Sequence, residues 1–373
     1  MTHVTSPQRL ILVGGGHAHL LVLRSLAQQR PTGVDITLIS PSRWQHYSGM
    51  LPGWMKGHYT LEACRIDLLP LVRQAGVTFI EDHIVGMDAE QRWVCLSDGT
   101  RVHHDLLSLD VGSEVDTQWL AGLGDKLLPI KPLAAFSEFW PRLMDQARSA
   151  TSMRLGVVGG GAAGVEAVLS AAVTLRGASA QPRLWLITGV HGVLPGHSQA
   201  VRRRAEQALH AAGIEVVQRR AAGTTRGVML DDGSELTLDA VIAATGARSP
   251  VWLTLSKLNL DEHGFVAVNE HHQSTSHPNV FAAGDVCARM DRAVARSGVH
   301  AVRAGPVLAH NLLASLQGRA LRPYIPRRWS LYLLATGADQ AIASWGPFSA
   351  TGRWVWRLKD RIDRGFMARF QRP

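Results

Sequence analysis

The stretch that decides the fold is R-L-I-L-V-G-G-G-H-A-H-L-L-V-L, residues 9–23. Its apolar run, residues 10–13, is too short for a buried helix and is typical of a buried strand. Three glycines, residues 14–16, follow directly, and residues 17–26 then read as a helix with an apolar face. A strand, a glycine turn and a helix form the opening unit of a dinucleotide-binding fold, in which the turn and the helix N-terminus hold a pyrophosphate.

A second copy of this unit strengthens the prediction. Residues 155–165 read L-G-V-V-G-G-G-A-A-G-V and fill the G-x-G-x-x-G pattern completely, whereas the first copy has His19 in place of the third glycine. Both copies continue with the same order of turns, because Asp98-Gly99 and Asp232-Gly233 each separate two apolar runs as in a hairpin. The sequence therefore predicts an internal duplication of a nucleotide-binding module.

The composition is that of a globular protein with a basic surface. The chain has 373 residues and a formal net charge of +9, enough length for roughly two domains. No apolar run reaches the roughly 18 residues of a membrane span, and the scattered arginines form no nucleic-acid motif, so we expect no nucleic-acid partner. Cys64, Cys95 and Cys287 are too widely spaced for a redox pair or a metal site, which favours a reducing compartment, the cytoplasm.

A third informative stretch, residues 279–286, is a short strand that ends in Gly284-Asp285. An aspartate at a strand end can accept hydrogen bonds from a polyol, and the helix that begins near Gly298 can stabilise an anion at its N-terminus. Ser40 and Thr188 stand where dinucleotide sites usually carry an acid for the ribose, so both NADH and NADPH stay open as donors.

The C-terminal segment, residues 354–370, is amphipathic, with apolar side chains at three- and four-residue steps and arginines between them. This pattern is typical of a helix that lies on a membrane surface. The alternative is a helix packed on its own protein or on a partner in a homodimer. On the membrane interpretation, removal of residues 354–373 should leave the cofactor bound. The apolar stripe consists of Val355, Leu358, Ile362, Phe366 and Phe370.

Together these motifs resemble the FAD-dependent pyridine nucleotide-disulfide oxidoreductase superfamily over nearly the whole chain. Within it, the sequence looks most like the type II NADH dehydrogenase and sulfide:quinone reductase branch. Residues 14–19, 47–53 and 109–113 also resemble the flavoprotein module that is fused to some selenide, water dikinases. No cysteine lies in the loop of residues 41–53, which excludes the flavin-to-disulfide relay of the disulfide reductases.

The resemblance implies an α/β fold with two Rossmann-like dinucleotide-binding domains. Each domain is expected to have a three-layer ββα architecture, with two layers of strands and one layer of helices. In such an arrangement the NAD(P) domain is inserted into the FAD domain, and a small C-terminal region with the amphipathic helix follows. The expected boundaries are 1–130 and 267–325 for the FAD-binding domain, 131–266 for the NAD(P)H-binding domain and 326–373 for the C-terminal region.

The resemblance also implies an enzyme that transfers hydride from NAD(P)H to FAD and passes electrons to a small-molecule acceptor such as a quinone. Glu166, in the first turns of the second helix, is expected to face the nicotinamide as the catalytic residue. No metal is expected. The expected cofactor-binding residues are Gly14, Gly15, Gly16, His17, Ala18, His19, Ser40, Gly112, Gly284, Asp285, His300 and Ala301, and, on the NAD(P)H side, Gly159, Gly161, Ala162, Gly164, Thr245 and Gly246.

Two alternatives stay open. The first is a sulfur- or selenium-handling flavoenzyme related to sulfide:quinone reductase, whose activity would depend on Cys287. The second is a flavin-bound redox sensor or partner-docking protein, which would show no turnover with small acceptors. The quinone interpretation places the protein at the periphery of a membrane, on its inner face.

Overall fold

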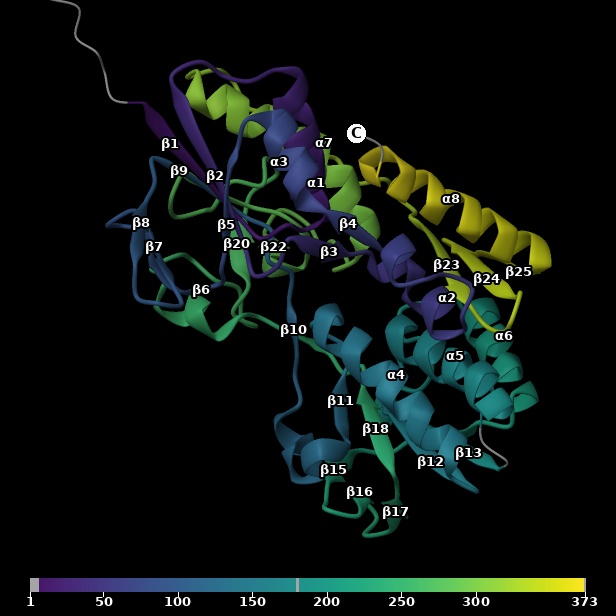
Figure 1. The fold of residues 1–373 in the computed structure, drawn as a ribbon. Coiled ribbons are helices and arrows are strands. Elements are labelled where there is room, and N and C mark those ends of the chain that lie inside the picture. The colour runs from purple at the N-terminus through teal and green to yellow at the C-terminus, as the bar shows by residue number, and fades with distance from the viewer. Residues whose placement is uncertain (1–6, 179–180, 372–373) are drawn as a thin grey trace, which may run out of the picture.

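Two parallel β-sheets form the two halves of the molecule (Figure 1). The computed structural model describes residues 7–178 and 181–371. The first six residues of the predicted FAD-binding domain, residues 179–180 of the predicted NAD(P)H-binding domain and the last two residues of the predicted C-terminal region therefore lie outside the described residues. The first sheet has the order β21 (Val280–Ala282), β9 (Leu106–Leu109), β1 (Gln8–Val13), β2 (Val34–Ser40) and β5 (Thr78–Glu81). The second has the order β11 (Leu127–Pro129), β18 (Ala240–Ala243), β12 (Met153–Val158), β13 (Pro182–Ile187) and β14 (Glu215–Val217). The predicted α/β fold with parallel sheets is confirmed.

The first sheet is the middle of three layers because β1 is apolar on both faces. Successive side chains of a strand point to opposite faces. Leu10 and Leu12 pack in a core with the helices, whereas Ile11 and Val13 pack in a second core with a three-stranded antiparallel sheet. The helices are α1 (His17–Gln28), α3 (Leu68–Ala75) and α7 (Gly298–Leu316), and the strands are β6 (Ile84–Asp88), β7 (Trp93–Leu96) and β8 (Arg101–His103).

The second half repeats this arrangement around a single continuous core. Its helices are α4 (Leu133–Ser149), α5 (Ala162–Ala178) and α6 (Gln199–Ala211), and its antiparallel strands are β15 (Ala221–Gly223), β16 (Gly227–Leu230) and β17 (Glu235–Thr237). The helix α4 begins at Leu133 and contains Pro141 in its interior. Burial of Phe136 and Trp140 stabilises the earlier turns and offsets the hydrogen bond that a proline removes.

The duplication extends to individual contacts. In the first half, the Arg9 backbone N–H donates to the Asp105 carboxylate at 2.8 Å, and in the second half Arg154 donates to Asp239 at 2.8 Å. Each arginine side chain also forms an ion pair with the same aspartate. Both contacts join the start of the first strand of a module to the start of the strand beside it.

The segment predicted as a long loop after β2 is structured. It forms β3 (Trp44–His46) and α2 (Leu51–Met55), and β3 pairs with β4 (Arg65–Asp67). The Thr174 hydroxyl of α5 donates to the Met55 carbonyl at 2.7 Å, so this segment joins the first half to the second. A second link is the antiparallel pair of β10 (Glu114–Val115) and β19 (Ala247–Arg248), where the chain crosses between the halves.

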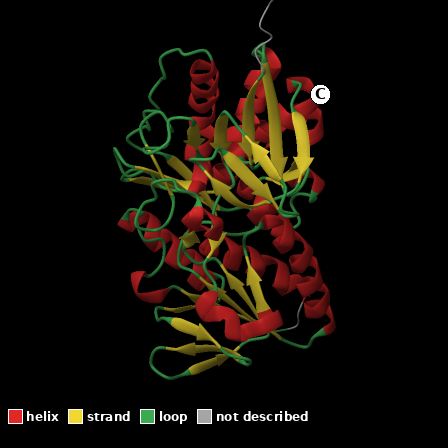
Figure 2. Cartoon of the chain, turned by 90° about the vertical axis from the view of Figure 1, so that its left-hand side faces the viewer, coloured by secondary structure: helices red, strands yellow, loops and turns green. Residues whose placement is uncertain are grey.

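The C-terminal region contains an antiparallel sheet that the sequence analysis missed. Its strands are β23 (Leu331–Ala335), β24 (Ala341–Trp345) and β25 (Phe348–Gly352). The last helix, α8 (Arg353–Gln371), packs across this sheet and against β4 of the first half. Figure 1 shows α8 along the outer edge of the molecule, and Figure 2 shows the strands of the upper and lower parts of the molecule with helices around them. Among the described residues, no helix combines the length and apolarity needed to cross a membrane.

The predicted apolar stripe of α8 is divided between two environments. Val355, Phe366 and Phe370 are buried in the core of the first half, whereas Leu358 and Ile362 are 36% and 46% exposed. Residues at steps of three and four drift around a helix of 3.6 residues per turn, so the stripe crosses the edge of the buried face. The interpretation of one continuous membrane face is therefore wrong, and a narrower exposed face remains.

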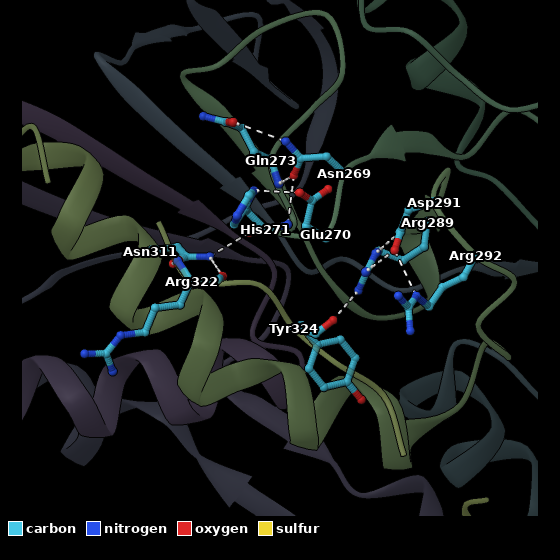
Figure 3. Close-up of polar contacts among 10 residues, drawn as sticks. All are labelled: Asn269, Glu270, His271, Gln273, Arg289, Asp291, Arg292, Asn311, Arg322 and Tyr324. Carbon is cyan, nitrogen blue, oxygen red and sulfur yellow. Dashed lines mark hydrogen bonds and ion pairs between the residues drawn. The ribbon is translucent and has the colours of Figure 1, made fainter. Parts of the chain in front are cut away.

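A polar network holds α7 in place beside the return to the first sheet (Figure 3). Asn311 of α7 donates from Nδ2 to the carbonyls of His271 and Arg322 at 2.9 and 2.8 Å. Arg289 lies on β22 (Cys287–Arg289), which pairs with β20 (Val266–Val268), and its guanidinium pairs with Asp291 and donates to the Tyr324 carbonyl at 3.1 Å. These contacts fix the segment between Gly284-Asp285 and the start of α7.

Candidate functional site

A cavity of about 1070 Å³ lies at the carboxyl ends of the first sheet, where segments of both halves meet. Its size is suited to a large elongated ligand. The predicted FAD residues that line it are Gly14, Gly15, Gly16, His17, Ser40, Gly112, Gly284, Asp285 and Ala301. Ala18, His19 and His300 lie outside its wall.

The first glycine turn is pressed against Asp110, which follows β9. Gly14 has a φ of +90°, and a Cβ on it would lie 2.5 Å from the Asp110 carbonyl oxygen. A Cβ on Gly16 would lie 2.5 Å from the Asp110 carboxyl carbon. Only glycine fits at these two positions, and the turn therefore presents bare backbone to the cavity.

Asp110 also occupies the N-terminus of α1. Its Oδ2 atom accepts the backbone N–H groups of Ala18 and His19 at 2.8 and 2.9 Å. Burial raises the pKa of Asp110 well above its usual value, and the charge of nearby Asp285 raises it further. The N–H groups of Ala18 and His19 are thus satisfied inside the protein, which leaves residues 15–17 to meet a ligand. Asp110 was missed because its partners are remote in the chain.

His19 takes the place of the third glycine by bonding to the turn itself. In the second module, a Cβ on Gly164 would lie 1.9 Å from the Gly159 carbonyl oxygen, so the helix and the turn touch directly. In the first module, His19 Nδ1–H donates to the equivalent carbonyl of Gly14 at 2.6 Å, and its Nε2 accepts from Ser108 at 2.8 Å. Burial lowers the pKa of His19 to about 4, so its ring is neutral.

His17 lines the cavity and contacts two aromatic rings, each from a different segment of the chain. Its ring centroid lies 5.4 Å from that of Tyr47 and 5.8 Å from that of Phe366 on α8. Burial lowers the pKa of His17 to about 4. Its Nε2 atom has no hydrogen-bond partner within the described part of the chain. A neutral imidazole with one unpaired nitrogen at the cavity wall fits contact with a bound ligand.

An ion pair that the sequence analysis missed crosses the cavity wall. Lys131 Nζ lies 2.9 Å from Asp285 Oδ2 and donates to the Ser113 hydroxyl at 3.2 Å. Lys131 follows β11 of the second sheet, whereas Asp285 follows β21 of the first. The pair therefore ties the two sheets together at the site and orients the Asp285 carboxylate.

The N-terminus of α7 lies at the same wall, at Gly298 and Ala301. Its N-cap residue, Ser297, makes no capping hydrogen bond, so the first N–H groups of this helix can meet a negatively charged ligand. His300 instead contacts the Tyr324 hydroxyl at 3.1 Å and lines a separate cavity of about 30 Å³.

Cys287 lines that small cavity and is poorly suited to sulfur chemistry. Its thiol donates to the Gly284 carbonyl at 3.4 Å, and burial raises its pKa to about 12. Burial also raises the pKa of Cys64 to about 12. The three cysteines form no disulfide with one another. The observations thus give no support to the sulfur- or selenium-handling alternative.

The second glycine turn has one open position. A Cβ on Gly159 would lie 2.1 Å from the Ala244 carbonyl oxygen, whereas a Cβ on Gly161 would have nothing within 4 Å. Gly161 therefore leaves room for a ligand at the N-terminus of α5, which begins at Ala162. Thr245 and Gly246 close the neighbouring strand end by hydrogen bonds to the backbone of Asp116.

Glu166 lies at the junction of α5, β23 and α8. Its carboxylate accepts the Ala335 N–H at 2.7 Å. Burial raises the pKa of Glu166, and the nearby positive charges of Lys359 and Lys56 act in the opposite direction. Lys359 itself is buried and pairs with Asp363 at 2.8 Å. This cluster could not be predicted from the sequence because its members come from distant segments.

A family model described as "Pyridine nucleotide-disulphide oxidoreductase" matches residues 8–305. An NADH dehydrogenase-like protein of Mycobacterium tuberculosis is 28% identical over 307 residues, which cover 76% of this chain and 74% of that protein. Human ferroptosis suppressor protein 1 is 25% identical over 305 residues, covering 77% of this chain and 75% of the relative.

Solved structures resemble the whole chain. The sulfide:quinone oxidoreductase of Aquifex aeolicus has a TM-score of 0.79 at 18% identity and covers 98% of this chain and 91% of its own. The NDH2 of Plasmodium falciparum has a TM-score of 0.76 at 14% identity, with 98% and 99% covered. At these identities the likeness shows a shared fold.

Gly161→Val should abolish reduction of the flavin by NAD(P)H and leave FAD bound. The new side chain meets open space, so the protein folds, but it occupies the path of the dinucleotide. We expect a loss of at least about 100-fold in affinity, equivalent to about 2.7 kcal/mol. Flavin absorbance and anaerobic reduction measure the two effects. Gly164→Val, which clashes with the Gly159 carbonyl, should disturb the fold itself. Loss of both cofactors from folded Gly161→Val protein would count against separate sites.

The contribution of His19 to stability should be lost as the pH falls from about 6.5 to about 4. An unfolded histidine binds a proton below about pH 6.5, whereas folded His19 does so only near pH 4. The unfolded state then binds more protons, so the free energy of unfolding falls, by about 3 kcal/mol for this residue. Urea unfolding at pH 7 and pH 5 measures the effect. His19→Asn should reduce the pH dependence of the free energy of unfolding, whereas the control His263→Asn, at an exposed position, should not. If the free energy of unfolding depends on pH as strongly in His19→Asn as in the wild type, the assignment to His19 is refuted.

Proposed function

The chain belongs to the pyridine nucleotide-disulphide oxidoreductase family, and from this premise we propose that it passes electrons from NAD(P)H through FAD to a quinone at a membrane surface. It is an NAD(P)H-dependent flavin oxidoreductase. The observation that carries the choice of acceptor is the position of α8. One face of this helix packs beside the cofactor cavity, and the opposite face presents apolar and basic side chains to the outside.

The first module holds FAD. When bound, FAD supplies a two-electron hydride acceptor, and the protein supplies position and electrostatic field. The backbone of Gly15, Gly16 and His17 binds the pyrophosphate at the start of α1. Asp285, oriented by Lys131, accepts hydrogen bonds from the hydroxyl chain of the cofactor. The uncapped N-terminus of α7 favours negative charge at the inner end of the cavity.

The second module holds NAD(P)H. Gly161 lets the pyrophosphate approach the N-terminus of α5, and Thr245 and Gly246 form the neighbouring edge of the nicotinamide site. Glu166, which the sequence predicts as the catalytic residue, is proposed instead as a positioning residue, because its bond to the Ala335 N–H holds α5 against β23. Hydride transfer between two cofactors needs no protein acid or base, so alignment of the two rings is the main task of these residues.

The inner face of α8 lies next to the cavity wall. Phe366 stacks on Tyr47 with ring centroids 4.7 Å apart, and both rings contact His17. The Tyr47 hydroxyl donates to Asp363 of α8 at 3.1 Å. An acceptor that reaches this helix from the membrane would thus be close to the cofactor without having to cross the protein core.

The outer face of α8 fits contact with an anionic membrane on the inner face of the bilayer. Trp354, Leu358 and Ile362 follow one another at four-residue steps and are 57%, 36% and 46% exposed. Exposed arginines lie on the adjoining side of the helix. Arg353 and Arg364 already pair with Asp339 and Asp360, and each of the other two could add about 1 kcal/mol of attraction to anionic lipid. Quinones are lipid-soluble acceptors, and a sulfide:quinone oxidoreductase is among the structural relatives. The arginines are Arg353, Arg357, Arg361 and Arg364.

Removal of the whole helix would not test this proposal. Deletion would take Val355, Phe366 and Phe370 out of the core and remove the ring beside His17, so loss of FAD is expected. Substitutions on the exposed face are the sharper experiment, because they leave the buried face intact.

The double variant Leu358→Glu/Ile362→Glu should bind anionic vesicles at least about 10-fold more weakly, because two exposed apolar side chains become charged. It should keep FAD and its turnover with the water-soluble acceptor ferricyanide, and lose turnover with a long-chain quinone in vesicles. Vesicle sedimentation and NAD(P)H oxidation measure these effects. The control is Val216→Glu/Met229→Glu, which changes two exposed apolar residues of the second half. Wild-type protein that reduces no quinone would refute the proposed acceptor.

A further inference from the structure

We infer that the loop after β13 and Arg202 of α6 form a subsite for the 2′-phosphate of NADPH, which makes NADPH the preferred donor. The inference rests on the proposed NAD(P)H site of the second module. It adds to that function the recognition of a phosphomonoester group by a specific side chain.

The end of β13 is the place where a dinucleotide fold meets the adenosine ribose. An acid at this position binds the ribose hydroxyls of NADH and repels a 2′-phosphate. Here β13 ends at Ile187 and is followed by Thr188, which is buried and fixed by its N–H bond to the Val217 carbonyl at 3.0 Å. No carboxylate therefore stands at the position that would exclude a phosphate.

The loop that follows is fixed on the glycine turn. The Leu194 N–H donates to the Gly160 carbonyl at 2.7 Å, and a Cβ on Gly160 would lie 2.3 Å from the Gly192 carbonyl oxygen. Such a Cβ would also lie 2.9 Å from the Thr188 side chain. The loop thus lies directly beside the turn that is proposed to hold the pyrophosphate, within reach of the adjoining ribose.

Arg202 points its guanidinium along this loop. Its Nε donates to the Val193 carbonyl at 3.1 Å, and its Nη2 lies 3.5 Å from where a Cβ on Gly192 would be. The Gln218 amide lies 3.6 Å from the same point and donates to the Val190 carbonyl at 3.0 Å. The Arg202 guanidinium and the Gln218 amide therefore both lie close to Gly192. The hydrogen bond from Arg202 Nε to the Val193 carbonyl fixes the direction of the guanidinium.

The charge around this point is positive. Within the described residues Arg202 forms no ion pair, and Glu206, one helical turn further along α6, is exposed and does not pair with it. Asp231 and Asp232, which follow β16, are paired with Arg219. Arginine binds phosphate through two parallel charge-assisted hydrogen bonds, so an arginine oriented without a carboxylate partner is suited to a phosphomonoester.

The same helix offers a matched control. Arg203 is the next residue on α6 and is exposed, and Arg204 points elsewhere, because its Nε donates to the Ser349 hydroxyl at 3.2 Å. If Arg202 were only a solvated surface arginine, replacing Arg202 or Arg203 would have the same small effect on nucleotide binding.

The test compares adenosine 2′,5′-bisphosphate with 5′-AMP, which differ only in the 2′-phosphate. Calorimetry on the full-length, FAD-loaded protein should show binding of the bisphosphate at least about 10-fold tighter, with an advantage that declines as salt increases. Arg202→Gln should abolish this advantage, and Arg203→Gln should retain it. The preference for NADPH over NADH in reduction of the flavin should change in parallel with this affinity advantage: Arg202→Gln should lose it and Arg203→Gln should keep it.

Equal affinities in the wild-type protein would overturn the inference, and so would an advantage that survives Arg202→Gln. If the affinities are equal while NADH still reduces the flavin, the proposed function stands and only the 2′-phosphate subsite is refuted. If neither nucleotide binds and neither NADH nor NADPH reduces the flavin, both the subsite and the proposed function are refuted.

Discussion

The rest of the structure depends on the buried carboxylate of Asp110. It accepts the N–H groups of Ala18 and His19 in the first turn of α1, and it lies against glycines from two distant motifs. A Cβ on Gly16 would lie 2.5 Å from its carboxyl carbon, and a Cβ on Gly284 would lie 2.6 Å from Oδ1. The turn that opens the chain and the strand end that returns late in the sequence are therefore packed on one side chain, and the cavity wall forms where they meet.

This packing explains why the site needs both halves of the molecule. The return segment brings Asp285 to the cavity, and Lys131 from the second sheet pairs with it. The same segment leads into α7, which the Asn311 and Arg289 contacts hold in place. On the other side, α8 packs its inner face beside His17. A cofactor bound in the cavity would touch residues that belong to both halves, which couples cofactor binding to their assembly.

Local patterns in the sequence predict much of this fold, because glycine turns, apolar strands and hairpin signals depend on neighbouring residues. The residue after β9 is different: Asp110 reads as an ordinary polar residue until its partners at Ala18 and Gly284 come together in space. The two faces of α8 also depend on the sheet beneath it, so periodicity alone merged Leu358 with buried Phe366. Glu166 was singled out by its place in the helix, but its bond to the Ala335 N–H could not be predicted from spacing.

The most direct test of the account is an anaerobic titration of the purified protein, followed at the flavin absorbance bands. We expect a yellow protein whose colour is bleached stoichiometrically by NAD(P)H and restored by a quinone supplied in lipid vesicles. A colourless protein that takes up no FAD, or a bound flavin that NAD(P)H does not bleach, would contradict it.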